Sequence, residues 1–396
     1  MNFVFISPNF PLIYSHFVKS LKQRGVNVFG IGDTPKEQIT LELKENLVEY
    51  CFVKDLSNEQ WMKDTLDYLE KKYGKIDYLE SNNEYWLLSD SKLREYKNIP
   101  NGFRPDDMDK IKYKSKMKEC FNKAGVKVAR YILLDNLKQA QEFALEVGYP
   151  LFVKPNNGVG AAKSYKIANE QELINFVNTK PNEQFILEEY LDGVIVTFDG
   201  IVDDESNPLL MYNETFPIPV SEVVNGNLDD YYYANMDMAD SFRNMGKAVV
   251  KAFGIRKRCF HIEFFLLKEN RPGLAEKGEI IALEVNMRSP GGDTPDLLSI
   301  CLDNSYYDAY ADIIVDNKIN FDLNKKHYIA ISVSRKDRFT YLRTIEEIQN
   351  KYQDNIIRHD HYSKEMALVM GNEFWMARFE TVEEALSFKD FVMEKK

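Results

Sequence analysis

The chain has 396 residues, which is too long for one ordinary hydrophobic core, so we expect two or three domains. Its 62 acidic residues outnumber its 51 lysines and arginines, which argues against a dedicated nucleic-acid-binding protein. No apolar run reaches the roughly 18 residues of a membrane-spanning helix. The short apolar start at 3–6 meets Pro8 at once and predicts a strand rather than a signal peptide. The four scattered cysteines are typical of reduced thiols in a cytoplasmic protein.

Strand and helix signals alternate over the first 108 residues. We expect strands at 3–6, 26–31, 46–53 and 76–80, and helices at 13–23 and 59–72. Such alternation predicts a mostly parallel sheet with helices on its faces. The first turn, Ser7 to Pro11, lacks the glycine-rich fingerprint of dinucleotide-binding proteins. We therefore expect a scaffold that contributes one wall of a substrate cleft.

A turn-rich segment at 100–105 marks the first domain boundary. Five lysines follow between Lys110 and Lys118, on a helix that is expected to end at Gly125. A row of lysines is more often a solvated helix face than a binding site. Both interpretations stay open at this point of the chain.

A glycine-rich loop at 156–164 joins two predicted strands at 151–154 and 165–167. The Walker pattern fails because Ala162 stands where glycine is required, and the dinucleotide fingerprint fails at Lys163. Such a loop can still close over phosphates with its backbone N–H groups. An ordinary hairpin turn is the more common meaning of the pattern.

The rest of the chain predicts an antiparallel sheet and further helices. We expect strands at 184–189, 198–202, 209–215, 259–266, 281–288 and 327–334, a helix at 238–253, and a last helix that starts at the capping box of Thr381 and Glu384.

The strand at 281–288 alternates apolar and polar residues. Its apolar side chains are expected to face the core: Leu283, Val285 and Met287. Its polar side chains are expected on the opposite face: Glu284, Asn286 and Arg288. A short loop joins it to the strand at 259–266, so the two should pair antiparallel and bring Glu263 opposite Glu284 and Asn286. Opposed carboxylates favour a divalent cation between them; the alternative is a sheet with one solvated face.

Taken together and in this order, the motifs resemble those of the ATP-grasp superfamily of carboxylate–amine ligases, in particular its L-amino acid ligase and biotin carboxylase-like branches. The resemblance covers residues from about 109 to 300. It implies a mixed α/β and α+β fold in four parts: an N-terminal parallel α/β domain at 1–108, a lid subdomain at 109–192, a core with the Mg·ATP and substrate site at 193–320, and a small C-terminal α/β subdomain at 321–396.

The resemblance also implies roles for particular residues. Lys114 and Lys154 are expected to bind the phosphates of the nucleotide. The glycine-rich loop, with Gly158, Gly160 and Lys163, is expected to close over them as a lid. The segment 186–193, which we call the hinge, is expected to bind the adenine through Glu188, Glu189, Tyr190 and Leu191. The expected ligands of two Mg²⁺ ions, with Mn²⁺ as a substitute, are Glu263, Glu284 and Asn286. Catalysis is expected from Lys154 and from Arg288, which would steady the acyl-phosphate.

The hinge departs from the family pattern at one point. Family members often place an acid a few residues after the hinge glycine to bind the ribose, whereas Val194 to Val196 follow Gly193 here. Asp192 and Asp199 are the candidates to replace that acid.

The implied activity is ATP-dependent activation of a carboxylate as an acyl-phosphate, which an amine then attacks to give an amide, ADP and phosphate. Small-molecule substrates, amino acids among them, are expected, with no nucleic-acid or membrane partner and a cytoplasmic location; a homodimer is left open. The alternatives are a carboxylase-type enzyme that activates bicarbonate and a non-catalytic nucleotide-binding regulator. The motifs do not identify the acid or the amine.

Overall fold

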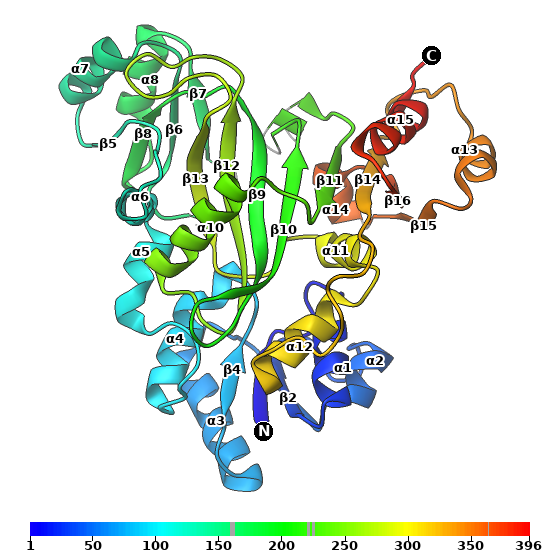
Figure 1. The fold of residues 1–396 in the computed structure, drawn as a ribbon. Helices are drawn as coiled ribbons and strands as arrows, with labels where there is room; N and C mark the ends of the chain where they lie inside the picture. Colours follow the sequence, from blue (N-terminus) through cyan, green and yellow to red (C-terminus); the bar gives the residue numbers. More distant parts are fainter. Residues whose placement is uncertain (159–162, 220–221, 224–225, 363) are drawn as a thin grey trace.

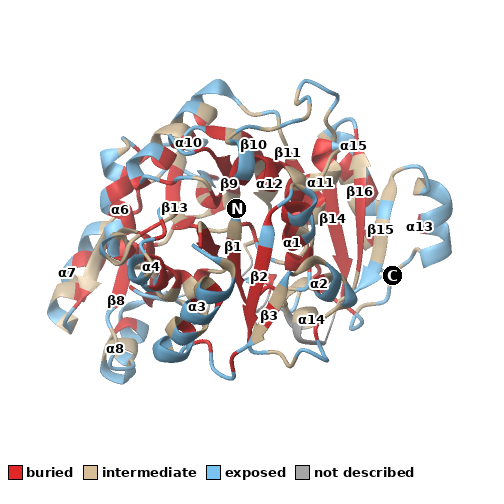
Figure 2. Cartoon of the chain, turned by 90° about the horizontal axis from the view of Figure 1, so that it is seen from below, coloured by how far each residue is buried: buried red, intermediate tan, exposed pale blue. Residues whose placement is uncertain are grey.

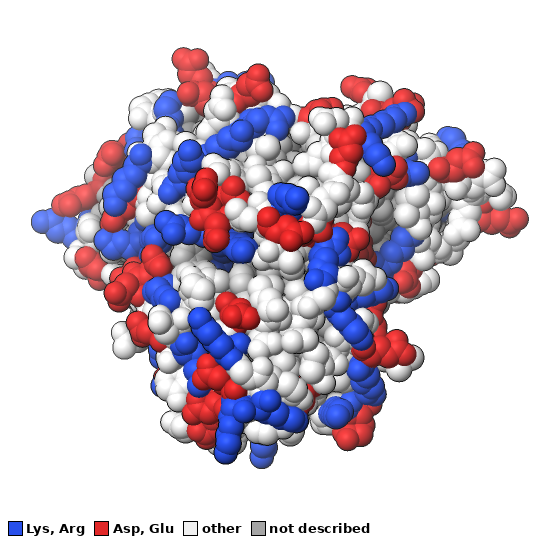
Figure 3. Space-filling view, turned by 60° about the horizontal axis from the view of Figure 1, so that its bottom comes forward, with Lys and Arg blue, Asp and Glu red and all other residues white. Residues whose placement is uncertain are grey.

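A computed structural model of the chain describes residues 1–158, 163–219, 222–223, 226–362 and 364–396. The strands form three sheets, with the N-terminal sheet below the largest one in Figure 1. Within the described ranges, no helix combines the length and the apolar character that crossing a bilayer requires. Acidic and basic side chains are interspersed over the face shown in Figure 3.

The N-terminal sheet is parallel, as predicted, and has the strand order β3-β2-β1-β4. Its elements are β1 (Asn2–Ile6), α1 (Tyr14–Gln23), β2 (Asn27–Gly32), α2 (Leu41–Asn46), β3 (Glu49–Phe52), α3 (Glu59–Tyr73), β4 (Tyr78–Glu80) and α4 (Leu87–Tyr96). The third strand begins later than expected because Thr40 caps α2, which runs into the predicted strand.

The second sheet is antiparallel, with the order β5-β8-β6-β7. The elements of this part are α5 (Met108–Lys112), α6 (Lys114–Lys123), β5 (Tyr131–Leu134), α7 (Leu137–Val147), β6 (Leu151–Pro155), β7 (Tyr165–Ile167), α8 (Glu170–Thr179) and β8 (Phe185–Glu189). The two strands that flank the glycine-rich loop pair as predicted. Within that loop, Gly160 lies outside the described residues.

The largest sheet has eight antiparallel strands in the order β13-β12-β9-β10-β11-β14-β16-β15. Its strands are β9 (Gly193–Val202), β10 (Pro208–Phe216), β11 (Tyr231–Asn235), β12 (Cys259–Leu267), β13 (Ile280–Asn286), β14 (Ile329–Arg335), β15 (Ile356–His361) and β16 (Glu373–Phe379). Its helices are α10 (Asp240–Phe253), α11 (Thr294–Leu302), α12 (Tyr306–Asp316), α13 (Ile345–Tyr352), α14 (Lys364–Met370) and α15 (Val382–Met393). Strands from both sides of the domain boundary expected at 320 belong to one continuous sheet, because β14 pairs with β11.

The two faces of this sheet differ in chemistry. On one face, phenylalanine and aliphatic side chains of β9 and β12 pack under α10. Gly246 of α10 allows the closest approach, since a Cβ there would lie 2.4 Å from the ring of Phe198. On the opposite face, the cross-strand pairs are polar: His261 is opposite Asp199 and Asn286, and Glu263 is opposite Glu284.

The N-terminal domain is fixed to the core by aromatic packing. The Phe17 ring of α1 lies edge-on against Tyr306, Tyr307 and Tyr310 of α12, with ring centroids 4.8–6.2 Å apart. In Figure 2 the strands β1 and β2 are largely buried, whereas the peripheral helices α3, α7 and α8 expose one side. The carboxyl ends of the parallel strands therefore stay in a fixed position next to the polar face.

Candidate active site

Glu263 and Glu284 are Cα partners across the antiparallel pair β12–β13, which confirms the predicted register. A β-bulge follows, because Glu263 pairs with Glu284 but Phe264 pairs with Ala282. The extra residue is Leu283, which was expected in the core. That expectation is wrong: the bulge shifts the alternation, and the half-buried Leu283 lines a pocket instead.

Each of the two opposed carboxylates has a cationic neighbour. Lys114 Nζ lies 3.2 Å from Glu284 Oε1 and 3.1 Å from the carbonyl oxygen of Gly158. His261 Nε2 lies 3.1 Å from Glu263 Oε1. Burial alone would raise the pKa of Glu263, but His261 and more distant cations, Arg288 among them, hold it below its usual value. Each of the two carboxylates at this site is therefore paired with a cationic side chain of the protein.

The pocket beside these strands has a volume of about 430 Å³ and is lined by the predicted hinge. The lining residues come from α6, β6, the hinge, the loop after β10, and β12–β13: Lys118, Ala129, Phe152, Glu188 to Gly193, Pro217 to Pro219, Glu222, Phe265, Lys268, Ala282 and Leu283. Two arginines stabilise the hinge. Arg130 donates to both carboxylate oxygens of Glu189. Arg271 donates to the carbonyl oxygen of Tyr190.

A buried ion-pair triad forms one corner of this pocket. Glu188 lies between Lys118 and Lys154, at 2.9 and 3.0 Å from their Nζ atoms. Burial would raise the pKa of Glu188, but the two ammonium groups outweigh burial and hold it at about 2. Burial lowers the pKa of Lys118, whereas Glu188 and Glu284 outweigh burial at Lys154 and raise its pKa.

Lys118 was missed as a site residue. Of the five closely spaced lysines, Lys114 and Lys118 are buried, whereas Lys116 is exposed and pairs with Glu119. The signal was the spacing of four residues between Lys114 and Lys118, which places both on one face of α6. The solvated-face interpretation therefore fails for these two lysines.

The remaining predicted residues fall into two groups. Leu191 lines the pocket, and the buried Asn286 lies beside the two glutamates at the end of β13. Lys163, by contrast, pairs with Glu183 at 2.8 Å on the surface. Of the two candidates for the ribose, Asp192 lines the pocket. Asp199 does not line it, since it is fully buried against His261.

Arg288 lies at the end of the polar row, just beyond β13. Its guanidinium donates to the carbonyl oxygen of Ser289 at 2.8 Å. Beyond it lies the segment after β4, where Asn82 and Glu84 of the N-terminal domain are buried. Within the described part of the chain, Glu84 Oε2, both amide atoms of Asn82 and Ser289 Oγ have no hydrogen-bond partner.

Glu84 is therefore a site residue that the sequence analysis did not name. Burial raises its pKa, and Arg288 is the first of the charged groups that oppose this rise. The available signal was a run of polar residues, Ser81 to Glu84, directly after a buried parallel strand. Such segments commonly line ligand clefts, because they follow the carboxyl ends of strands.

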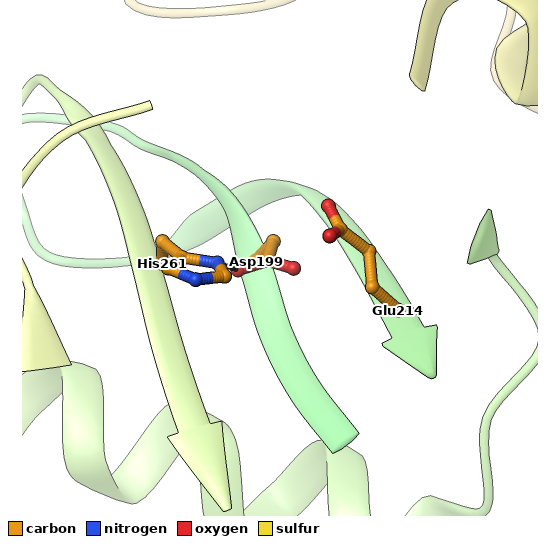
Figure 4. Close-up of side chains that lie close together, drawn as sticks. All are labelled: Asp199, Glu214 and His261. Atoms are coloured by element: carbon orange, nitrogen blue, oxygen red, sulfur yellow. Dashed lines mark hydrogen bonds and ion pairs between the residues drawn. The ribbon is translucent and has the colours of Figure 1, made fainter. Parts of the chain in front are cut away.

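One further cluster lies deeper in the same polar face. Asp199, Glu214 and His261 come from neighbouring strands and point toward one another (Figure 4). One potential ligand atom from each lies within 4.8 Å of the others, the only such group found among the described residues. His261 Nδ1 lies 2.6 Å from Asp199 Oδ1. Burial would lower the pKa of His261, but Asp199 and Glu263 raise it to about 10.

Comparison with known proteins identifies a matching domain family and similar folds. Residues 109–292 match the sequence model of the ATP-grasp domain family. The alanine–anticapsin ligase of Bacillus subtilis is 25% identical over 234 residues, which cover 51% of this chain and 48% of that ligase. The chain spans about half the length of the curated relatives it matches, or less.

Solved structures extend the similarity of fold to nearly the whole chain. The L-amino acid ligase from Bacillus licheniformis superposes with a TM-score of 0.72 at 16% identity, over 98% of this chain and 95% of that one. The biotin carboxylase domain of the Hydrogenobacter thermophilus 2-oxoglutarate carboxylase, solved with MgADP and bicarbonate, gives 0.68 at 17% identity, over 97% and 88%. Residues 109–292 therefore match an ATP-grasp domain, and the chain as a whole shares the fold of these solved structures.

Proposed function

We propose that the protein is an ATP-dependent ligase that activates a small-molecule carboxylate and joins it to an amine, releasing ADP and phosphate. The observation that carries the proposal is the row in which Glu263 is opposite Glu284 and Arg288 follows just beyond β13, near Glu263 and beside a pocket lined by the hinge. A protein that only bound a nucleotide would not need Arg288 at the far end of that row.

Glu263, Glu284 and Asn286 are the residues that would hold Mg²⁺. They fit it, because two carboxylates face each other across the strand pair and carboxylate and amide oxygens are ligands that Mg²⁺ prefers. When bound, Mg²⁺ would neutralise charge that develops on the transferred phosphoryl group.

The lysines that now compensate the carboxylates would turn to the phosphates. Lys154 is bound to Glu188, which lines the pocket, and Lys114 is bound to Glu284, the next residue after the pocket residue Leu283. Each ammonium group would exchange its carboxylate partner for a phosphate oxygen, and Mg²⁺ would neutralise the Glu284 carboxylate that Lys114 leaves. The hinge backbone at Glu189 to Leu191 would donate to and accept from the adenine edge.

Arg288 would bind the carboxylate substrate and steady its acyl-phosphate. Its guanidinium has planar N–H donors that match carboxylate and phosphate oxygens, and the hydrogen bond to the Ser289 carbonyl fixes its direction. No enzyme nucleophile is required, because the amine itself attacks the activated carbonyl carbon.

We propose an amino acid as one substrate. Glu84 is a buried acid near Arg288, and one of its carboxylate oxygens has no hydrogen-bond partner within the described residues. A buried carboxyl of this kind is stabilised by a cationic ligand group. An α-ammonium group supplies that charge, while Arg288 holds the carboxylate of the same molecule.

The test is turnover with Mg·ATP and pairs of L-amino acids. We expect release of ADP and phosphate and a new amide in the mass spectrum, absent with Glu284→Gln. Release of AMP would contradict the acyl-phosphate route. ATP hydrolysis stimulated by bicarbonate alone would favour a carboxylase, and Mg·ADP binding without turnover on any acid would favour a regulator.

A further inference from the structure

A row of polar side chains leads from the interior of the large sheet to the proposed metal site. Asp199 is opposite His261, and Thr197 is opposite Glu263, across β9 and β12. On the other side of β9, the backbone N–H of Glu214 donates to Thr197 Oγ1 at 3.0 Å, and Thr197 Oγ1 donates to Asp199. Strand register, rather than loop geometry, therefore fixes the order of the row.

His261 bridges the two ends of this row. Its Nδ1 lies 2.6 Å from Asp199 Oδ1 and its Nε2 lies 3.1 Å from Glu263 Oε1. The Asp199 carboxylate is fully buried, whereas a quarter of the Glu263 side chain is exposed. Glu263 is thus the only one of these three groups that extends to the surface of the site.

A metal ion within the cluster itself explains this geometry less well. His261 Nδ1 and Asp199 Oδ1 are already at hydrogen-bond distance, which leaves no space for an ion between them. The third member, Glu214, is fully buried, and burial together with the nearby Asp199 raises its pKa well above the usual value. Both carboxyl oxygens of Glu214 are without a hydrogen-bond partner within the described residues, but a neutral carboxyl group is a poorer cation ligand than a carboxylate.

We propose that His261 and Asp199 are positioning residues that hold Glu263 in the orientation needed to bind the metal. The inference rests on the proposed function, because it takes Glu263 to be a metal ligand. A glutamate side chain on a strand has several rotamers, and a bond from one oxygen to a fixed imidazole selects among them. Groups that orient a metal ligand in this way typically contribute about 10- to 100-fold to metal affinity.

The experiment measures ADP binding by calorimetry, with MgCl₂ and with EDTA. His261→Asn keeps a donor near the position of Nδ1 but is too short to reach Glu263. His261→Gln places a donor closer to the position of Nε2. We expect the Mg²⁺-dependent gain in ADP affinity to fall about 10-fold or more in His261→Asn and to recover in part in His261→Gln. Asp199→Asn should give an intermediate loss, since the imidazole remains but loses its charged anchor.

ADP affinity in EDTA should change less than about twofold in all three variants, because the hinge pocket is untouched. His359→Asn is the matched control: His359 also bonds a glutamate, Glu373, at 2.8 Å, but on β15 at the opposite edge of the sheet. It should bind Mg·ADP like the unmodified protein.

Three outcomes would overturn the inference. Equal losses of ADP affinity with and without Mg²⁺ would assign a merely structural role to His261. Unchanged Mg²⁺ dependence in both His261 variants would show that Glu263 needs no support. A stoichiometric metal in the purified protein that disappears in Asp199→Asn would make the cluster itself the metal site. If Mg²⁺ has no effect on ADP binding by the unmodified protein, the proposed function fails first and the inference fails with it.

Discussion

The charged groups on the two sides of Arg288 differ in how they are compensated. On the hinge side, Glu188 and Glu284 each contact at least one lysine ammonium group at about 3 Å. On the side of the N-terminal domain, Glu84 Oε2 and the amide of Asn82 have no hydrogen-bond partner within the described residues. The carboxylates on the hinge side are therefore paired with lysines in the absence of a ligand, whereas Glu84 is not.

The difference indicates what each side has to do. On the hinge side, phosphate oxygens would replace the carboxylates as partners of Lys114 and Lys154, while Mg²⁺ would neutralise Glu284 and Lys118 would stay paired with Glu188. Buried polar atoms without a partner destabilise the protein by about 1–3 kcal/mol each, and a polar ligand removes that cost. The side near Glu84 is therefore where we expect substrate specificity to lie, and the following predictions test this division.

The largest expected effect is on turnover in Glu284→Gln. The amide keeps the shape of the side chain but removes the charge that would hold Mg²⁺, so we expect kcat/KM for ATP to fall at least about 100-fold. The fold should be retained, since Lys114 keeps Gly158 as an acceptor. ADP release and circular dichroism measure the two effects. Unfolding of the variant would show that this face of the sheet is structural.

The next largest effect is on stability, in Glu188→Gln. Removing the carboxylate leaves Lys118 and Lys154 buried and close together without a counter-charge. Breaking a buried ion pair in this way costs about 3 kcal/mol or more, which urea unfolding measures. The double variant Lys118→Met/Glu188→Gln should recover much of the loss. If Glu188→Gln is as stable as the unmodified protein, the triad does not stabilise the hinge side.

Acid should weaken the same triad. The pKa of Glu188 is about 2 in the folded protein, against 4.5 for an ordinary glutamate. Its contribution to stability is therefore complete above about pH 4.5 and is lost as the pH falls from there toward 2. The stability difference between the unmodified protein and Glu188→Gln should shrink over that range in urea titrations. A difference that stayed constant between pH 7 and pH 3 would contradict this assignment.

A smaller and more selective effect is expected from Glu84→Gln. If Glu84 binds an ammonium group, the KM for the amino acid should rise about 10-fold, equivalent to one charge-assisted hydrogen bond. Mg·ADP affinity should not change, because the hinge pocket is separate. Glu95→Gln, at an exposed position of α4, is the control. Equal changes in KM for ATP and for the amino acid would contradict the division between the two sides.

The hinge side could be predicted from the sequence because its signals are local. The alternation around Glu284 and the short loop between β12 and β13 were enough to place Glu263 opposite it. The bulge at Leu283 could not be predicted, since the same alternation fits a regular strand. Lys118 was recognisable only once α6 was known to be buried on the face it shares with Lys114.

The side near Glu84 could not be predicted in the same way. Glu84 and Arg288 are far apart in the sequence and influence each other only in the folded chain, where the packing of α1 against α12 fixes one domain on the other. Nothing in the residues around Glu84 shows that Arg288 will lie nearby. The parallel sheet was predicted correctly. A polar run after a parallel strand predicts that a cleft lies there, but it does not predict which distant residues line that cleft.

The smallest expected effect is from Lys163→Ala, and it concerns a residue that the motif analysis placed at the phosphates. Its ammonium group pairs with Glu183 on the surface, and more than half of its side chain is exposed. An exposed pair of this kind contributes little to stability, so we expect Mg·ADP affinity to change less than about twofold. Lys154→Ala should weaken it far more, since Lys154 is buried beside the pocket. A loss of 10-fold or more in Lys163→Ala would mean that Lys163 leaves Glu183 when the nucleotide binds. The exchange of a carboxylate partner for a phosphate would then involve the surface pair of Lys163 and Glu183 as well as the buried lysines.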